Sequence, residues 1–406
     1  MAISEGISGN PGAVNTKLGL GLISKLTRLD KLGIFLGGLW VGNGDYLFGG
    51  GIKPRSWNFN SVFILDLQID SDLAIRLPGG RLGVSYLRFN GQPANSAAGI
   101  ITGYDGLTQA SPLVRDELYQ LWWRQSLFHD KLIVRVGKTV PTYDFNNVVK
   151  PVPVNSENLS IPAVTGLIYT PAFVNPSILG NLPGYYNSAY GVTTTFAPLP
   201  QLYFSYGIYD GNLARGVQTG LKTAPEFTGY YFQIGEAGYA WLLGQNELPR
   251  NIGAGGWGQT GRLTAGSGPP TISENGVGGF YCFGAQRLWF QHPRIDNSGL
   301  SAFYQFGIND SSTMLADKYF GFGITGVGLV PRRSADSIGT GLAWSWLNRP
   351  PGSGRRSNEA MLATYYQMHV FSGIFLQPTF TFIPNPGAAT DVNSATALTL
   401  QAMVLF

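Results

Sequence analysis

Residues 61–70 carry the most regular set of side chains that could bind a polar solute. Asp66, Gln68 and Asp70 occupy every second position there, and leucine and isoleucine occupy the positions between them. Successive side chains of a β-strand point to opposite faces, so this spacing predicts a strand with one polar and one apolar face. The polar face offers carboxylate and amide groups, which bind hydroxyl-rich or ionic solutes through hydrogen bonds.

Residues 115–145 repeat this pattern as a predicted hairpin that turns at residues 128–131. Gln120 and Arg124 share one face of its first strand, and Arg135 interrupts the valines of its second. The opposite face of the first strand is predicted to hold Tyr119, Leu121, Trp123 and Leu127. The hairpin therefore adds guanidinium groups to the predicted polar surface.

Together these segments supply planar hydrogen-bonding groups and an aromatic face, the two features that bind sugars. The candidate substrate-binding residues are Asp66, Gln68, Asp70, Glu117, Gln120, Trp122, Arg124 and Arg135. Gln305 and Gln377 are expected on the same polar surface, with Tyr203 and Tyr209 as further aromatic faces. A generic hydrated wall explains the same spacing and stays open as the alternative.

Catalytic patterns are weak in this sequence. His129, His292 and His369 stand outside any metal-ligand or nucleophile spacing, and a glycosidase needs two carboxylates that flank one bond. Residues 253–258 and 321–326 match the glycine spacing of dinucleotide sites, but no helical pattern follows either match. We therefore predict no enzymatic activity, no cofactor and no metal.

The composition of the 406-residue chain favours a β-rich membrane protein. It has 56 glycines, 13% aromatic residues and only 12% charged residues, about half the usual charged share of soluble domains. No run of about 18 apolar residues predicts a transmembrane helix. A large secreted β-sandwich or β-helix is the alternative. The net charge of +4 includes no basic run typical of nucleic-acid binding, and the single cysteine, Cys282, excludes an internal disulfide.

The pattern along the chain predicts about sixteen strands in one domain, residues 1–406. Residues 1–33 form an N-terminal arm, in which Leu22, Ile23, Leu26 and Leu29 predict a short helix with Gly33 as its C-cap. Residues 90–113 are polar and glycine-rich and are expected to be an external loop. Residues 146–188 are the longest irregular stretch, which predicts a functional loop folded into the interior.

The last 34 residues, 373–406, decide the fold class. Two alternating runs flank a turn at residues 384–393, and the second run ends on Phe406. A final strand that pairs with the first closes the sheet and removes both edges. The prediction is an all-β, antiparallel transmembrane β-barrel.

Three stretches resemble the carbohydrate-selective porins of Gram-negative outer membranes. They are LTRLDKLGIFLGG (26–38), ELYQLWWRQSLFHDKLIVRVGK (117–138) and, most specifically, LQPTFTFIPNPG (376–387). Phe406 is similar to the terminal aromatic residue of outer-membrane barrels. Thr379 departs from the acidic residue that the family usually has there, and residues 1–21 lack its N-terminal signature. The resemblance therefore supports the fold more directly than a sugar preference.

The resemblance implies a sixteen-stranded outer-membrane barrel with an N-terminal helix and pore-constricting loops, through which monosaccharides diffuse. We expect a constriction lined by Arg124, Arg135, Asp66 and Glu117. The expected partners are small sugars, outer-membrane lipid and lipopolysaccharide, with no nucleic acid, in a monomer or homotrimer. The first ten residues carry no signal-peptide pattern, so we interpret Met1 as the start of a mature sequence. The alternatives are a general porin, an outer-membrane barrel enzyme and a secreted β-rich carbohydrate-binding protein.

Overall fold

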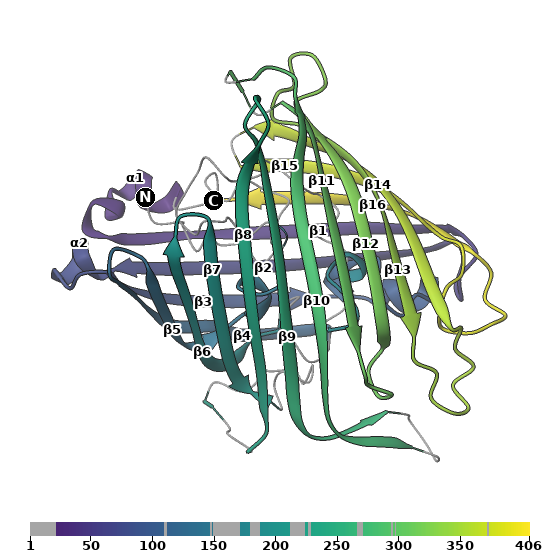
Figure 1. The fold of residues 1–406 in the computed structure, drawn as a ribbon. Coiled ribbons are helices and arrows are strands. Elements are labelled where there is room, and N and C mark those ends of the chain that lie inside the picture. Colours follow the sequence, from purple (N-terminus) through teal and green to yellow (C-terminus); the bar gives the residue numbers. More distant parts are fainter. Residues whose placement is uncertain are drawn as a thin grey trace.

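Sixteen strands, β1 to β16, close into one antiparallel barrel in which each strand pairs with its neighbours in sequence and β1 pairs with β16 (Figure 1). The computed structural model describes residues 22–108, 112–146, 148, 171–178, 187–211, 224–225, 229–265, 271–293, 295–296, 298–371 and 373–406. The predicted fold class and strand number are confirmed. Among the described helices, none is long and apolar enough to cross a membrane.

The strands range from short to strongly extended. Their bounds are β1 (Ile34–Gly49), β2 (Ser56–Asp70), β3 (Gly80–Asn90), β4 (Val114–Leu127), β5 (Leu132–Thr139), β6 (Ala189–Leu199), β7 (Leu202–Asp210), β8 (Tyr231–Leu243), β9 (Leu248–Ala265), β10 (Ile272–Phe290), β11 (Gly299–Asn309), β12 (Ala316–Val327), β13 (Ser337–Leu347), β14 (Asn358–Phe371), β15 (Ile374–Ile383) and β16 (Ala395–Leu405).

The period-two pattern separates two surfaces of the barrel. On β15, for example, Thr379 is 6% exposed on the inner face whereas its neighbour Phe380 is 50% exposed on the outer face. Large apolar side chains such as Leu400 and Tyr206 are likewise exposed on the outside. An apolar outer surface on a closed sheet is the arrangement that lipid requires, because closure leaves no backbone group unpaired at an edge.

The first and last strands meet as the sequence predicts. β1 and β16 pair from Leu39 opposite Leu405 onward. The backbone N–H of Gly38 donates to the carbonyl of Phe406 at 2.9 Å, and Phe406 donates back to Gly38 at 3.0 Å. The Phe406 ring stacks on Phe63 of β2 with centroids 5.8 Å apart. The terminal residue thus completes the closing seam.

The helices are short. α1 (Leu22–Thr27) is followed by the 3-10 turn η2 (Leu29–Leu32), and Gly33 caps that turn with a φ of 76°. Residues 1–21 of the expected N-terminal arm lie outside the described residues. The other described helical segments are α2 (Ser71–Ile75), α3 (Ala94–Ala98), η3 (Gly106–Thr108), η4 (Pro141–Tyr143) and η7 (Pro171–Phe173).

The antiparallel order gives the barrel two distinct ends. We call the end where β1 begins and β16 finishes the terminal end; its connections include residues 128–131 and 244–247. We call the opposite end the loop end, and it carries the long connections at residues 91–113 and 140–188. Short turns at one end and long loops at the other are typical of outer-membrane barrels.

The expectation that residues 90–113 form an external loop is wrong, because the described part of this segment folds into the barrel. Glu359 on the inner face of β14 accepts hydrogen bonds from the backbone N–H groups of Ile101 and Thr102, each at 2.9 Å. Asp105 accepts from Asn43 of β1 and Asn60 of β2, each at 2.7 Å. Small and apolar residues of the segment are buried against the wall. The polar composition of the segment as a whole did not indicate this burial.

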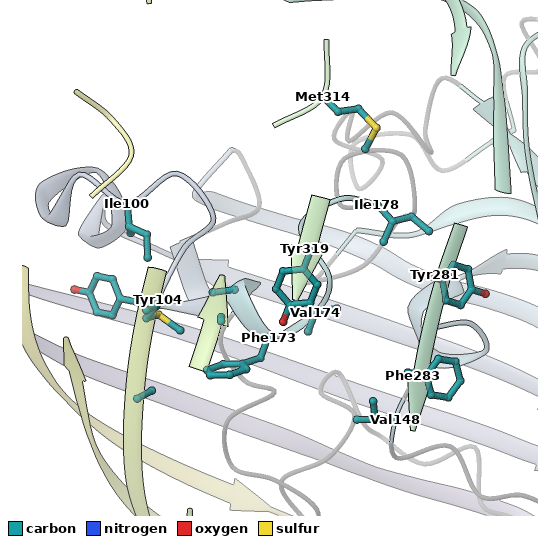
Figure 2. Packing of buried hydrophobic residues seen from close by; sticks show 14 of the residues in the cluster. Ile100, Tyr104, Val148, Phe173, Val174, Ile178, Tyr281, Phe283, Met314 and Tyr319 are labelled. Atoms are coloured by element: carbon teal, nitrogen blue, oxygen red, sulfur yellow. The ribbon is translucent and has the colours of Figure 1, made fainter. Parts of the chain in front are cut away.

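A second inward segment, residues 171–178, packs beside the first. The N–H of Ala172 donates to the carbonyl of Gly103 at 3.0 Å. Figure 2 shows Phe173, Val174 and Ile178 among aromatic side chains of the barrel wall, and the Phe173 ring meets Phe303 of β11 edge-on. The expected inward fold of residues 146–188 is therefore seen at residues 171–178, whereas residues 149–170 and 179–186 lie outside the described residues.

Candidate functional site

Three arginines stand directly opposite one another on neighbouring strands. Arg81 of β3 pairs in register with Arg124 of β4, which pairs in register with Arg135 of β5. All three side chains lie on the inner face. Like charges directly across a sheet are destabilising, so this arginine row needs nearby carboxylates to offset its charge. Arg81 was not identified from the sequence as a site residue. Its position next to Leu82, which faces outward, indicates that its own side chain faces inward.

Carboxylates flank the arginine row on both sides. Asp70 of β2 lies 3.5 Å from Arg81, and Asp144, which follows η4, forms an ion pair with Arg135. Asp144 belongs to an inward turn rather than to a strand, so the loop end of the chain contributes to the charge of the wall. The positive charge of the arginine row is thus partly offset by two nearby carboxylates.

Trp122 lies next to the arginine row on the same inner face. Its neighbours in register are Gly83 of β3 and Gly137 of β5. A Cβ atom at Gly83 would lie 2.3 Å from the indole, so only glycine leaves room for the ring there. The Arg135 guanidinium carbon lies 5.7 Å from the ring centroid. The buried indole Nε1–H has no hydrogen-bond acceptor among the described residues.

A hydrogen-bond network continues this wall across β2, β3 and β4. Ser85 donates to one oxygen of Asp66 at 2.5 Å, and Gln68 Nε2 donates to the other at 2.9 Å. Gln120 Nε2 lies 3.3 Å from Ser85 Oγ. The network fixes the orientation of both amides.

A β-bulge changes which residues of β4 face inward. Ser85 pairs with Gln120 but the next residue, Tyr86, pairs with Leu118, so Tyr119 is the extra residue. The prediction that Tyr119 shares the outer face with Leu121 is therefore wrong, because its side chain is fully buried inside. The bulge also brings Glu117 to the inner face.

Beyond the bulge, Glu117 belongs to a separate charged group. Its carboxylate lies 3.3 Å from the guanidinium of Arg115, which itself stacks 4.8 Å from the ring centroid of Phe89. Lys138 of β5 donates to the carbonyl of Leu118 nearby, at 2.7 Å. None of the basic residues in this group was identified from the sequence.

The structure does not bring the four expected constriction residues to one place. Arg124 and Arg135 are direct neighbours, but Glu117 is seven residues from Arg124, about 23 Å along the strand. Asp66 lies between these positions. Asp70 stands at the terminal end, where its carboxylate accepts hydrogen bonds from the backbone N–H groups of Asp72 and Leu73 and caps α2.

Of the other residues named from the sequence, Tyr209 lies beside this wall, because its hydrogen-bond partner Thr193 stands in register with Arg135, and the rest lie elsewhere on the barrel. Tyr203 donates to Glu236 at 2.5 Å, and Tyr209 shares a hydrogen bond with Thr193 at 2.6 Å. Gln377 of β15 accepts from Gln367 at 2.9 Å, and Gln305 faces inward on β11. The side chains of Tyr203, Tyr209 and Gln377 are thus engaged in structural contacts of the barrel.

Three buried carboxylates that the sequence analysis missed anchor the inward segments. Glu359 and Asp105 hold residues 91–108, and Glu236 accepts from the N–H of Asn146 at 2.7 Å. Burial raises the pKa of the Asp105 carboxyl above its usual range. Nothing local in the sequence marks these residues, because their partners are distant along the chain. Among the described residues, no group of three potential ligands could hold a metal ion.

Comparisons with known proteins agree with this architecture. The model of the carbohydrate-selective porin family OprB matches residues 63–406. The high-pH structure of Pseudomonas putida OprB is 19% identical, covers 94% of this chain and 96% of its own, and superimposes with a TM-score of 0.80. The low-pH structure of that protein is 15% identical, with 94% and 95% coverage and a TM-score of 0.58. No curated protein matches the sequence.

The closed sixteen-stranded barrel and a family match that spans most of the sequence lead to one conclusion: the chain belongs to the carbohydrate-selective porin family OprB.

Proposed function

We propose that this porin conducts monosaccharides and similar small solutes across the bacterial outer membrane by facilitated diffusion. Family membership supports a sugar channel in general, and one observation supports the proposed route. That observation is the arginine row of Arg81, Arg124 and Arg135 with Trp122 beside it on the inner wall. We assign the solute path to this wall, with Asp66, Gln68, Gln120 and Glu117 as further contacts.

The chemistry of this wall suits a sugar. Guanidinium groups donate to hydroxyl oxygens in a planar fork, and the amides of Gln68 and Gln120 can both donate and accept. The Trp122 face can cover the C–H surface of a pyranose. Binding must stay weak for the solute to leave, so several modest contacts serve transport better than one tight site. No covalent step is involved.

The surroundings of the barrel follow from its surfaces. The apolar outer face would contact outer-membrane lipid and lipopolysaccharide, with the short turns of the terminal end toward the periplasm. We expect a monomer or a homotrimer and no nucleic-acid partner.

Single-channel conductance in a planar bilayer, with glucose and related sugars titrated in, tests this function. We expect steady open channels whose current falls saturably as sugar is added. Open channels whose current does not change with added sugar would indicate a general porin and would overturn the proposed sugar-binding path. Folded protein that never inserts, and that stays soluble without detergent, would instead indicate a secreted carbohydrate-binding protein.

A further inference from the structure

An arginine lies on the outer, apolar surface of the barrel near the terminal end. Arg250 is the third residue of β9 and follows the turn at residues 244–247 closely. Its neighbours on the same outer face include Ile252 and Leu288, each 41% exposed, and Tyr239, which is 45% exposed. The guanidinium therefore sits within the lipid-facing surface, at its border with the terminal end.

Arg250 is held by side chains from both adjacent strands. Trp241 of β8 and Gln286 of β10 stand directly opposite it in register. The guanidinium carbon lies 5.3 Å from the centroid of Trp241, and Nε donates to Gln286 Oε1 at 2.9 Å. Nη2 donates to the same oxygen. This arrangement fixes the plane of the guanidinium and leaves its Nη1 amino group directed at no acceptor of the described residues.

No described carboxylate pairs with Arg250. By contrast, Arg88, another outward arginine but at the loop end, lies 3.8 Å from Asp116. Tyr304 of β11 covers Gly284, two residues from Gln286, and adds a second aromatic ring with a hydroxyl to the surroundings of Arg250. The site is thus a fixed cation in an aromatic frame, without an anion of its own.

A cation at an apolar surface is costly unless an anion or water neutralises it. Tryptophan and tyrosine concentrate where a bilayer's headgroups meet its acyl chains, so the frame places Arg250 at the depth of lipid phosphates. Guanidinium and phosphate form strong, charge-assisted hydrogen bonds. We propose that Arg250, Trp241, Gln286 and Tyr304 form a binding site for the phosphate of one phospholipid headgroup in the leaflet at the terminal end.

Native mass spectrometry of the lipid-stripped, full-length barrel in detergent tests this site. Phosphatidylglycerol is titrated in, and diacylglycerol with the same acyl chains serves as the phosphate-free comparison. We expect Arg250→Gln to lower the affinity for the first bound phosphatidylglycerol about fivefold, the size expected for one arginine at a lipid surface. The affinity for diacylglycerol should not change. Arg88→Gln is the matched control and should bind phosphatidylglycerol as the unmodified protein does.

Two results would overturn the site. One is equal phosphatidylglycerol affinity in Arg250→Gln and the unmodified protein. The other is displacement of the lipid by millimolar inorganic phosphate, which would show a site for free anions instead. Should Arg250→Gln not fold, Gln286→Ala is the second variant. It removes the acceptor that holds the guanidinium and should lower the affinity for phosphatidylglycerol about twofold. Channel conductance should not change in either variant, so this test stands apart from that of sugar transport.

Discussion

The inner faces of β3–β5 and β7–β12 obey the same period-two pattern but hold different side chains. On β3–β5 the inward positions carry arginines, a glutamate and Trp122. On β7–β12 eight inward positions carry aromatic residues: Tyr203, Tyr209, Phe232, Trp257, Tyr281, Phe283, Phe303 and Tyr319. We call these the charged wall and the aromatic wall.

The described inward segment 171–178 packs on the aromatic wall, where Phe173 meets Phe303 and Val174 lies near Tyr319 (Figure 2). Apolar surface on the inside of a barrel is stabilised when chain covers it, because covering removes it from water. The amide of Asn309 on β11 then donates to the carbonyl of Ser177 at 2.7 Å and fixes the backbone of this segment. The two walls of one closed sheet therefore differ in their contacts: the aromatic wall packs against the inward segment 171–178, whereas the charged wall holds arginines that pair with carboxylates.

Removing a loop anchor should have the largest effect and should leave the charged wall intact. Glu359→Ala deprives Ile101, Thr102 and Gly387 of their acceptor, so residues 91–108 should detach from the wall. We expect amide-exchange protection at Ile101 and Thr102 to fall about 100-fold, because several buried donors lose a partner. Glu359→Gln keeps one acceptor and should lose less. Unchanged protection would show that the anchor is dispensable.

Removing charge from the charged wall should act on solute rather than on loops. Arg124→Ala combined with Arg135→Ala should weaken the block of current by sugar about tenfold, since two charged donors are lost, and should lower anion preference. The outward pair Arg88→Ala and Arg262→Ala removes the same charge from the outer face and is the control. Sugar affinity that survives in the first double variant would exclude these arginines from the site.

Trp122 tests whether the charged wall also needs an aromatic face. Trp122→Ala should weaken sugar affinity about fivefold, within the usual range of an aromatic contact. Gly83→Ala places a methyl group against the indole and should shift it, with a smaller loss in the same direction. The outward neighbour Trp123 supplies the control, because Trp123→Ala should leave sugar titrations unchanged. An equal loss in both tryptophan variants would contradict a specific role for Trp122.

The smallest effect concerns pH and the anchor Asp105. Burial raises the pKa of this carboxyl when the segment is anchored, so the anchored state holds its proton to higher pH than the detached state does. Anchoring should therefore be strongest at acidic pH and weaken as pH rises through the raised pKa. Asp45 of β1 is the carboxylate beside Asp105, and both accept hydrogen bonds from the amide of Asn60.

We expect amide protection of residues 100–107, corrected for intrinsic exchange, to be about threefold lower at pH 8 than at pH 5. Asp105→Asn should flatten this dependence. Residues 171–178, which pack through apolar contacts, provide the internal control and should show little change. Stronger protection of residues 100–107 at pH 8 than at pH 5 would contradict the predicted pH dependence of anchoring.

Much of the barrel was predictable because period-two alternation is local. The hairpin turn at residues 128–131 even determines that Arg124 faces Arg135, since both are equally far from the turn. Other features depend on distant partners. Glu359 binds residues more than 250 positions away, so no local pattern could show that residues 91–108 fold inward. The bulge at Tyr119 was hidden because an inward and an outward aromatic residue look alike in sequence.

The bulge at Tyr119 has a consequence for how such walls can change. Each strand assigns its residues to two faces by odd or even position, and one extra residue reverses that parity for all residues on one side of it. Deleting Tyr119 would place Leu118 next to Gln120 and remove the bulge, so Arg115 and Glu117 would keep their partners on β3 and their inward direction. A bulge therefore lets a strand take up one inserted residue while the residues on both sides of it keep their faces, so an insertion of this kind leaves the rest of the wall unchanged.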